Sequence, residues 1–132
     1  MALHLSEQQF ADLKKDKRIE EKAVRVGQSQ ERRFRSKLEA AYAGYLHVLM
    51  LAGDIQFYKF EPLTLILGAD CRLTPDFLVM TKDGTIELHE VKGFRREDAM
   101  IKLRVAARTF HWWPLILVER KRGVWEQKEM RP

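Results

Sequence analysis

Residues 73–92 constrain the fold of this chain most, because they have the pattern of two strands joined by a tight turn. Apolar and β-branched residues dominate residues 73–81 and 85–92, and Asp83-Gly84 lies between the two segments. An Asp-Gly pair between alternating apolar residues is a strong signal for a β-hairpin. We therefore predict that the two segments pair as antiparallel neighbours.

The second predicted strand carries charged residues where a core strand should have none. Side-chain alternation assigns its residues to two faces: Ile86, Leu88, Glu90 and Lys92 to one, and Glu87, His89 and Val91 to the other. The charges of Glu90 and Lys92 therefore continue an aliphatic face. Burying a charge there is costly unless a partner or a metal compensates, so such a conflict marks a candidate site.

The length of the turn decides which residues face each other. A two-residue turn would place Asp76 opposite Val91, and the carboxylates of Asp76 and Glu90 would point to opposite faces. A three-residue loop, residues 82–84 with Gly84 in the left-handed conformation, gives a different set of pairs: Met80 with Ile86, Leu78 with Leu88, Asp76 with Glu90, and Thr74 with Lys92. We predict this second register. It aims two carboxylates at one point, where a divalent cation would relieve their repulsion.

Pro75-Asp76 followed by Glu90-Val91-Lys92 resembles the PD-(D/E)xK nuclease superfamily. With an upstream glutamate in Ser36-Lys37-Leu38-Glu39, the chain is similar to small phage-type nucleases of the endonuclease I, Holliday-junction-resolvase kind. The resemblance covers about residues 36–118. It implies a restriction-endonuclease-like fold and hydrolysis of DNA phosphodiester bonds with Mg²⁺ or Mn²⁺.

The resemblance also implies roles for individual residues. The implied catalytic residues are Glu39, Asp76, Glu90 and Lys92, and the implied metal ligands are Asp76, Glu90, the Val91 carbonyl and Glu39. Lys92 would orient or deprotonate the attacking water and balance phosphate charge. Simpler interpretations remain open: a turn role for Asp76, a Glu90–Lys92 ion pair, a Lys92 side chain that extends to solvent, and a Glu39–Arg35 ion pair in one helix.

Basic residues beside the predicted site are candidates for DNA contact. Arg95 and Arg96 follow Gly93 at the start of a predicted helix, which is a favourable position for phosphate. Two more residues complete the set of predicted nucleic-acid-binding residues: Arg35, and Lys102, whose role the resemblance implies. An ion pair between Asp98 and Lys102 on one helix is the alternative interpretation for Lys102. We expect His89 to face away from Glu90 as a structural histidine.

Charge is distributed unevenly along the 132 residues. The net charge is +5, with a balance of +4 over residues 1–37, −4 over residues 38–92 and +5 over residues 93–132. An acidic centre between basic flanks suits an enzyme that binds a cation centrally and a polyanion around it. Ordinary solubility is the alternative explanation.

The remaining composition points to a soluble protein in a reducing compartment. The chain has a single cysteine, Cys71, and no apolar segment approaches the ~20 residues that a membrane span needs. We expect a cytoplasmic location, in a bacterium or a phage-infected host cell, with residues 1–30 as a basic helical arm and residues 31–132 as the nuclease domain.

Hydrophobic periodicity predicts an α/β fold with a mixed sheet flanked by helices. The predicted helices are residues 6–22, 31–51 and 96–110, and the predicted strands are residues 55–60, 63–67, 73–81, 85–92 and 113–119. Strand, helix and strand within residues 86–119 form a βαβ unit, whose strands should be parallel.

These patterns favour a metal-dependent endodeoxyribonuclease. Branched DNA such as a Holliday junction is the substrate that the resemblance implies. A homodimer is expected, because cutting two strands needs two sites, and the first predicted helix could form the interface. A transposase- or packaging-associated nuclease is one alternative, and a catalytically inactive DNA-binding module on the same fold is another.

Overall fold

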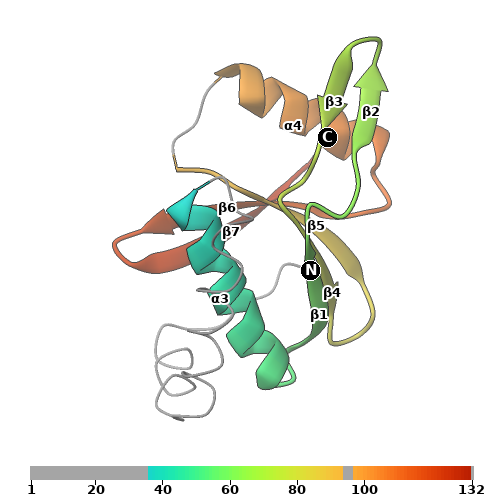
Figure 1. Ribbon diagram of the computed structural model, residues 1–132. Coiled ribbons are helices and arrows are strands. Elements are labelled where there is room, and N and C mark those ends of the chain that lie inside the picture. The colour runs from blue at the N-terminus through green and yellow to red at the C-terminus, as the bar shows by residue number, and fades with distance from the viewer. Residues whose placement is uncertain (1–35, 94–96, 132) are drawn as a thin grey trace.

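A five-stranded mixed sheet forms the centre of the structure (Figure 1), a computed structural model that describes residues 36–93 and 97–131. The strands lie in the order β1-β4-β5-β6-β7. Their bounds are β1 Ile55–Phe60, β4 Phe77–Thr81, β5 Ile86–Val91, β6 Leu115–Lys121 and β7 Val124–Met130. The predicted α/β class with a mixed sheet is confirmed. The predicted helix over residues 6–22 lies outside the described residues.

The βαβ unit has the predicted arrangement. Helix α4 (Glu97–Thr109) connects β5 to β6, and the two strands pair in parallel from Leu88–Leu115 to Val91–Val118. The helix is amphipathic, with Leu103 buried against the sheet. The unit places the end of β5 and the start of α4 at the same edge of the sheet.

Helix α3 (Lys37–Leu51) begins later than the predicted residue 31. Ser36 is extended, with φ −143°, and its Oγ accepts a hydrogen bond from the N–H of Glu39 at 3.1 Å. A serine in this position satisfies a backbone donor that the first turn of a helix leaves unpaired. The boundary prediction was wrong because apolar periodicity alone does not locate a cap.

The predicted strand over residues 73–81 is two strands. Strand β3 (Cys71–Leu73) pairs with β2 (Leu65–Gly68) in a separate two-stranded sheet, and β4 starts only at Phe77. Pro75 lies between β3 and β4; proline has no N–H to donate to a ladder, which explains the break. The side chains of Thr64 and Thr74 hydrogen-bond at 2.7 Å.

Strand β7 was not predicted from the sequence. It pairs with β6 through the two-residue turn Arg122-Gly123, whose φ angles are +53° and +77°. Positive φ at both central residues is typical of the type I′ hairpin turn. The sequence does contain a signal for this hairpin, the Arg122-Gly123 pair before residues 124–130. Those residues are mostly polar, however, so hydrophobic periodicity did not identify them as a strand.

The β4–β5 hairpin has the predicted register. Phe77 pairs with His89 and Leu78 with Leu88, so the next position along places Asp76 beside Glu90. The loop spans residues 82–84, and Gly84 has φ +90°. The predicted pair Thr74–Lys92 was wrong, because β4 begins only at Phe77 and the Thr74 hydroxyl instead contacts that of Thr64.

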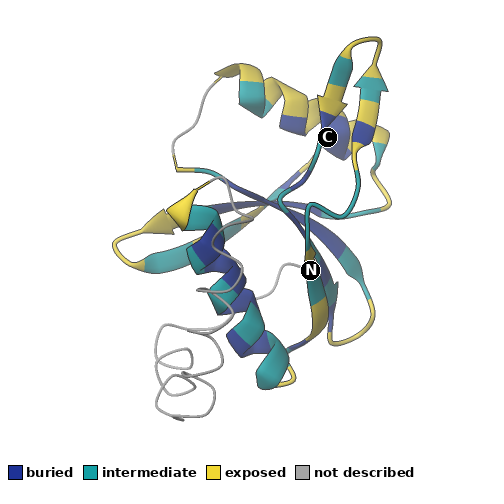
Figure 2. Cartoon of the chain, in the orientation of Figure 1, coloured by how far each residue is buried: buried dark blue, intermediate teal, exposed yellow. Residues whose placement is uncertain are grey.

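Each face of the main sheet is covered by a different layer. Helix α3 packs on one face, over a cluster that includes Phe77, Val79 and Val91. Helix α4 and the β2–β3 sheet pack on the other face, over a cluster that includes Leu88 and Leu117. Figure 2 shows the buried residues concentrated between these layers and the sheet. The predicted two faces of β5 are therefore confirmed.

Candidate functional site

The side chains of Asp76 and Glu90 meet at the end of the β4–β5 hairpin. Glu90 is only 5% exposed, and its side chain hydrogen-bonds the carboxyl group of Asp76. Asp76 Oδ2 also accepts a hydrogen bond from the N–H of Val91 at 2.8 Å. The register therefore brings together the two carboxyl groups that the sequence singled out.

Burial changes the acidity of this pair. Desolvation, followed by the hydrogen bond and the charge of Glu90, raises the pKa of Asp76 to about 8; the Val91 N–H and the Lys92 charge oppose the shift. Two close carboxyl groups in a partly buried place share a proton rather than both ionise. A divalent cation is the species that would let both carboxylates stay charged.

Lys92 extends from the end of β5 beside this pair. Its Nζ lies 3.7 Å from Glu90 Oε2, and its side chain is 28% exposed. The ammonium group is therefore within reach of both the carboxyl pair and solvent. The Glu90–Lys92 ion pair that the sequence left open is present, and it leaves the Asp76–Glu90 contact unexplained.

A pocket of about 450 Å³ opens where β5 ends and both helices begin. Its lining comes from these three segments: Ser36, Leu38, Val91, Lys92, Gly93, Asp98 and Ala99. Leu38 is a neighbour of Gly93: a Cβ added at Gly93 would lie in ordinary van der Waals contact with Leu38 Cδ2, at 3.8 Å. The pocket gives Lys92 space for a ligand at the edge of the sheet.

The backbone carbonyl of Val91 is directed toward the Asp76 side of β5. Leu88 and Lys92 donate their N–H groups to Pro114 and Val118, on the β6 side. Neighbouring residues of a strand direct their polar groups to opposite sides, so Val91 directs both of its groups toward β4. Its N–H bond to Asp76 agrees with this, and the carbonyl keeps its predicted role as a ligand candidate.

Glu39 does not join Asp76 and Glu90 in one cluster. Within residues 36–93 and 97–131, no group of three or more His, Cys, Asp and Glu side chains could hold a metal ion. Glu39 lies on α3, which covers the opposite face of the sheet from Leu78 and Leu88, the neighbours of the carboxyl pair. Its role as a catalytic residue and ligand stays a prediction.

The predicted DNA-binding residues lie mostly outside the described ranges. Arg35, Arg95 and Arg96 are among the residues that the structure does not describe. Lys102 is exposed on α4. Its contact with phosphate stays a prediction.

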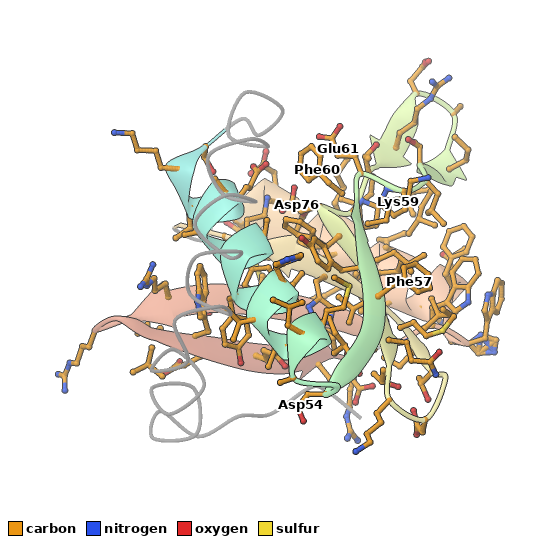
Figure 3. All side chains as sticks on the ribbon, turned by 60° about the horizontal axis from the view of Figure 1, so that its bottom comes forward. Asp54, Phe57, Lys59, Phe60, Glu61 and Asp76 are labelled. Atoms are coloured by element: carbon orange, nitrogen blue, oxygen red, sulfur yellow. The ribbon has the colours of Figure 1, made fainter. Side chains whose placement is uncertain are left out.

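Glu61 is a neighbour of Asp76 that sequence reasoning missed. It follows β1, and its N–H donates to the carbonyl of Asp76 at 2.8 Å. Figure 3 shows Asp76 near Phe60 and Glu61 at this end of β1. Glu61 has φ +44°, an uncommon conformation for a residue other than glycine. The turn at Glu61 thus ties the backbone of Asp76 to the edge strand.

A buried network of hydrogen-bonded side chains lies on the other face of β5, the strand that carries Glu90. His89 Nε2 lies 3.0 Å from Glu87 Oε1, and His89 Nδ1 lies 2.6 Å from the Tyr42 hydroxyl, which accepts from Gln127 Nε2 at 3.0 Å. Burial raises the pKa of Tyr42 and lowers the pKa of His89. The Tyr42 hydroxyl therefore donates to Nδ1 of a neutral ring, while Nε2–H donates to Glu87. His89 is buried and faces away from Glu90, as predicted.

The chain matches no protein-family model, no curated protein and no solved structure in three comparisons. The geometry around Asp76, Glu90 and Lys92 is therefore the basis for proposing a function. No helix in the described part of the chain is long and apolar enough to cross a membrane.

Proposed function

We propose that this protein is a Mg²⁺-dependent endonuclease that hydrolyses DNA phosphodiester bonds. The observation that carries the proposal is the convergence of the Asp76 and Glu90 carboxyl groups beside the Lys92 ammonium, next to an open pocket. A hairpin with the shorter turn would have separated the two carboxyl groups. The resemblance of the same residues to the PD-(D/E)xK pattern supports this interpretation.

The donor set suits Mg²⁺ or Mn²⁺. Mg²⁺ is commonly held by one or two carboxylates together with water and substrate phosphate, so a cluster of three protein ligands is not required. Asp76 and Glu90 would hold the cation, with the Val91 carbonyl as a third donor and Glu39 as a further candidate. When bound, the cation would supply Lewis-acid stabilisation of the charge that develops on the phosphate.

The protein's own groups have separate roles in the proposed reaction. A water oxygen attacks phosphorus, the bond between phosphorus and the 3′-oxygen breaks, and the water's proton passes to solvent while the 3′-oxygen takes up a proton. Lys92 orients the water and offsets negative charge on the phosphate. To hold a cation, Asp76 would have to lose its proton, because burial and the neighbouring Glu90 raise its pKa to about 8.

Branched DNA, such as a four-way junction, is the proposed substrate. The support is the resemblance to endonucleases of the resolvase kind, together with basic residues on both flanks of the acidic centre. A homodimer would supply one site for each strand of such a substrate. The cytoplasmic location stays a prediction.

Incubation of supercoiled plasmid with the full chain tests the activity. We expect nicking with Mg²⁺ and none with EDTA, and loss of nicking in Asp76→Asn. Asp70→Asn is a matched control, because Asp70 is exposed and has φ +57°, a conformation that asparagine tolerates. Intact plasmid together with retained DNA binding would instead indicate the inactive DNA-binding module.

Comparison of a labelled four-way junction with a linear duplex of the same arm sequence tests the substrate. We expect faster cleavage of the junction under single-turnover conditions. Equal rates on the two substrates would remove the junction preference but keep the nuclease activity. The transposase- and packaging-associated nucleases would then be the better candidates.

A further inference from the structure

Trp112 is a large aromatic residue that the described fold leaves open to solvent, with 58% of its surface exposed. It lies just beyond α4, in the segment that leads to β6. Phe110 and Trp113 beside it are partly buried against the cluster under α4, and their rings are nearly parallel, at 6°. The ring of Trp112 meets these two at 71° and 65°. Two anchored rings therefore support an indole that stays accessible.

The segment that ends near Trp112 is basic. Residues 101–113 contain no acidic residue and three basic ones, all exposed: Lys102, Arg104 and Arg108. Within residues 36–93 and 97–131, no ion pair joins these three to an acid. The acids of α4 lie in its first turn, and Asp98 is one turn before Lys102, so it offsets part of that charge. The charges of the two arginines lie further along the helix.

Two exposed aliphatic residues lie among these charges. Ile101 is 52% exposed and Val105 is 41% exposed. They are four residues apart, so they are neighbours on the helix surface. At 3.6 residues per turn, Lys102 and Arg104 fall on either side of this pair. Figure 2 shows most of α4 as exposed. We call the following residues the α4 surface: Ile101, Lys102, Arg104, Val105, Arg108 and Trp112.

An open aromatic ring among basic residues is typical of surfaces that bind single-stranded nucleic acid. Bases stack on aromatic side chains while Lys and Arg contact phosphates, and the stacking tolerates any sequence because every base has a π-face. In a duplex the base faces are already stacked on each other, so a side chain reaches them only in an unpaired strand. We infer that the α4 surface binds an unpaired DNA strand, with a base stacked on Trp112 and phosphates at Arg104 and Arg108. The choice of DNA as the ligand rests on the proposed function.

Other occupants fit the α4 surface less well. A second copy of this surface would place three bases against three bases, and residues 1–37 of the chain carry a positive balance of +4, so neither has complementary charge. A membrane contact needs a wide apolar face, but the side of α4 that includes Leu103 packs against the sheet. Nucleic acid supplies both the negative charge and the flat apolar rings.

The α4 surface begins near the candidate site and extends away from it. Asp98 and Ala99, in the first turn of α4, line the pocket that also contains Lys92. A 13-residue helix is about 20 Å long, and Trp112 lies beyond its far end. The phosphate at Lys92 and the base at Trp112 would therefore be roughly 20 Å apart. A branched substrate with a duplex arm at the pocket and an unpaired arm along α4 satisfies both contacts.

Binding of labelled oligothymidylate of about 20 nucleotides to the full chain in EDTA tests the inference. We expect Trp112→Ala to bind about fivefold or more weakly, and Trp112→Phe to keep most of the affinity, since a phenyl ring still stacks. Phe57→Ala is the matched control, because Phe57 is also an exposed aromatic residue, at 39%, but lies on the edge strand β1 (Figure 3). Circular dichroism checks that each variant folds.

Tryptophan emission reports the stacking itself. The chain has three tryptophans, and the other two, Trp113 and Trp125, are less exposed than Trp112. We expect oligothymidylate to quench the emission of the parent protein. Most of this quenching should be lost in Trp112→Phe, although that variant still binds. Quenching that is the same in both proteins would contradict a base at Trp112.

The salt dependence of binding tests the arginines. A variant with both Arg104→Ala and Arg108→Ala should bind more weakly, and the slope of log affinity against log salt should fall by about 0.7 for each single-strand phosphate contact that is lost. Lys59→Ala is the matched control, since Lys59 is an exposed base on β1 (Figure 3). An unchanged slope in the double variant would remove the phosphate contacts.

Several outcomes would overturn the inference. Trp112→Ala that binds oligothymidylate like the parent would do so, as would an equal loss in Phe57→Ala. An equal loss of affinity for a blunt duplex of the same length would show that the surface contacts paired DNA and not an unpaired base. If Trp112→Ala loses binding only to vesicles of anionic phospholipid, the surface is a membrane contact.

These outcomes are separable from those of the nuclease proposal, because binding is measured in EDTA. A protein that binds oligothymidylate through Trp112 but nicks no plasmid with Mg²⁺ keeps this inference and contradicts the proposed activity. Nicking that persists while Trp112→Ala binds oligothymidylate like the parent keeps the activity and overturns the inference.

Discussion

The carboxyl group of Asp76 is hydrogen-bonded to the side chain of Glu90 across the end of the β4–β5 hairpin. The Val91 N–H holds Asp76 in place at 2.8 Å, and Lys92 lies 3.7 Å from Glu90. These contacts bring two carboxyl groups and one ammonium group together, and Lys92 also lines the pocket at the end of β5. The predictions on catalysis and on pH dependence follow from this relationship.

Asp76→Asn and Glu90→Gln should abolish Mg²⁺-dependent cleavage without unfolding the protein. An amide is a poorer ligand than a carboxylate for a hard cation. Loss of a group that merely supports a metal ligand costs about 10–100-fold, so we expect a larger loss here. Single-turnover cleavage of plasmid measures it, with Asp70→Asn and the exposed Glu126→Gln as controls. Activity within tenfold of the parent would remove the metal assignment.

Asp76→Asn should stabilise the metal-free protein increasingly as the pH rises from about 4 to about 8. The folded-state pKa of Asp76 is raised from 3.8 to about 8, so its stabilising contribution is complete below 3.8 and is lost as pH rises through 8. Asparagine does not titrate and escapes this loss. Thermal melts of both proteins in EDTA across this range measure the effect. A difference in melting temperature that does not change with pH would contradict the pKa shift.

Lys92→Ala should slow single-turnover cleavage while DNA affinity stays within a few-fold of the parent. The proposed role of Lys92 is in the transition state, whereas the basic flanks supply affinity. Cleavage rates at saturating protein and fluorescence anisotropy with labelled DNA separate the two effects, and Lys128→Ala, at an exposed position of β7, is the control. A collapse of affinity at an unchanged rate would make Lys92 a phosphate anchor.

Tyr42→Phe should destabilise the protein by about 1–3 kcal/mol, because it leaves His89 Nδ1 and Gln127 Nε2 without their hydroxyl partner inside the core. Tyr58→Phe is the matched control. Its hydroxyl makes a longer, 3.3 Å contact with His47 in a partly exposed place, so the loss should be smaller. Urea denaturation measures both. An equal decrease in the free energy of unfolding for both variants would mean that the buried hydrogen bonds of Tyr42 with His89 and Gln127 add no specific stability.

The local sequence was sufficient to predict the hairpin on which the candidate site depends. Alternation along residues 86–91 assigned Leu88 and Val91 to opposite faces of the sheet. The choice of the three-residue loop over the two-residue turn followed from placing the Asp76 and Glu90 carboxylates on one face. The βαβ unit was likewise predicted, because a parallel crossover needs a helix of about the length that periodicity indicated. These features depend on residues close in sequence, whose patterns repeat with the period of the structure.

Tertiary structure alone decided what lies around the hairpin. Pro75 separates β3 from β4, and β3 pairs with β2 in another sheet, which periodicity could not show. The contact of Tyr42 with His89 joins residues 47 positions apart, and that of Tyr42 with Gln127 joins residues 85 apart. Glu39 lies on the helix that covers the other face, although the resemblance implied a place for it in the site. Such relationships depend on which faces pack together, and a one-dimensional pattern records the face of each element but not its partner.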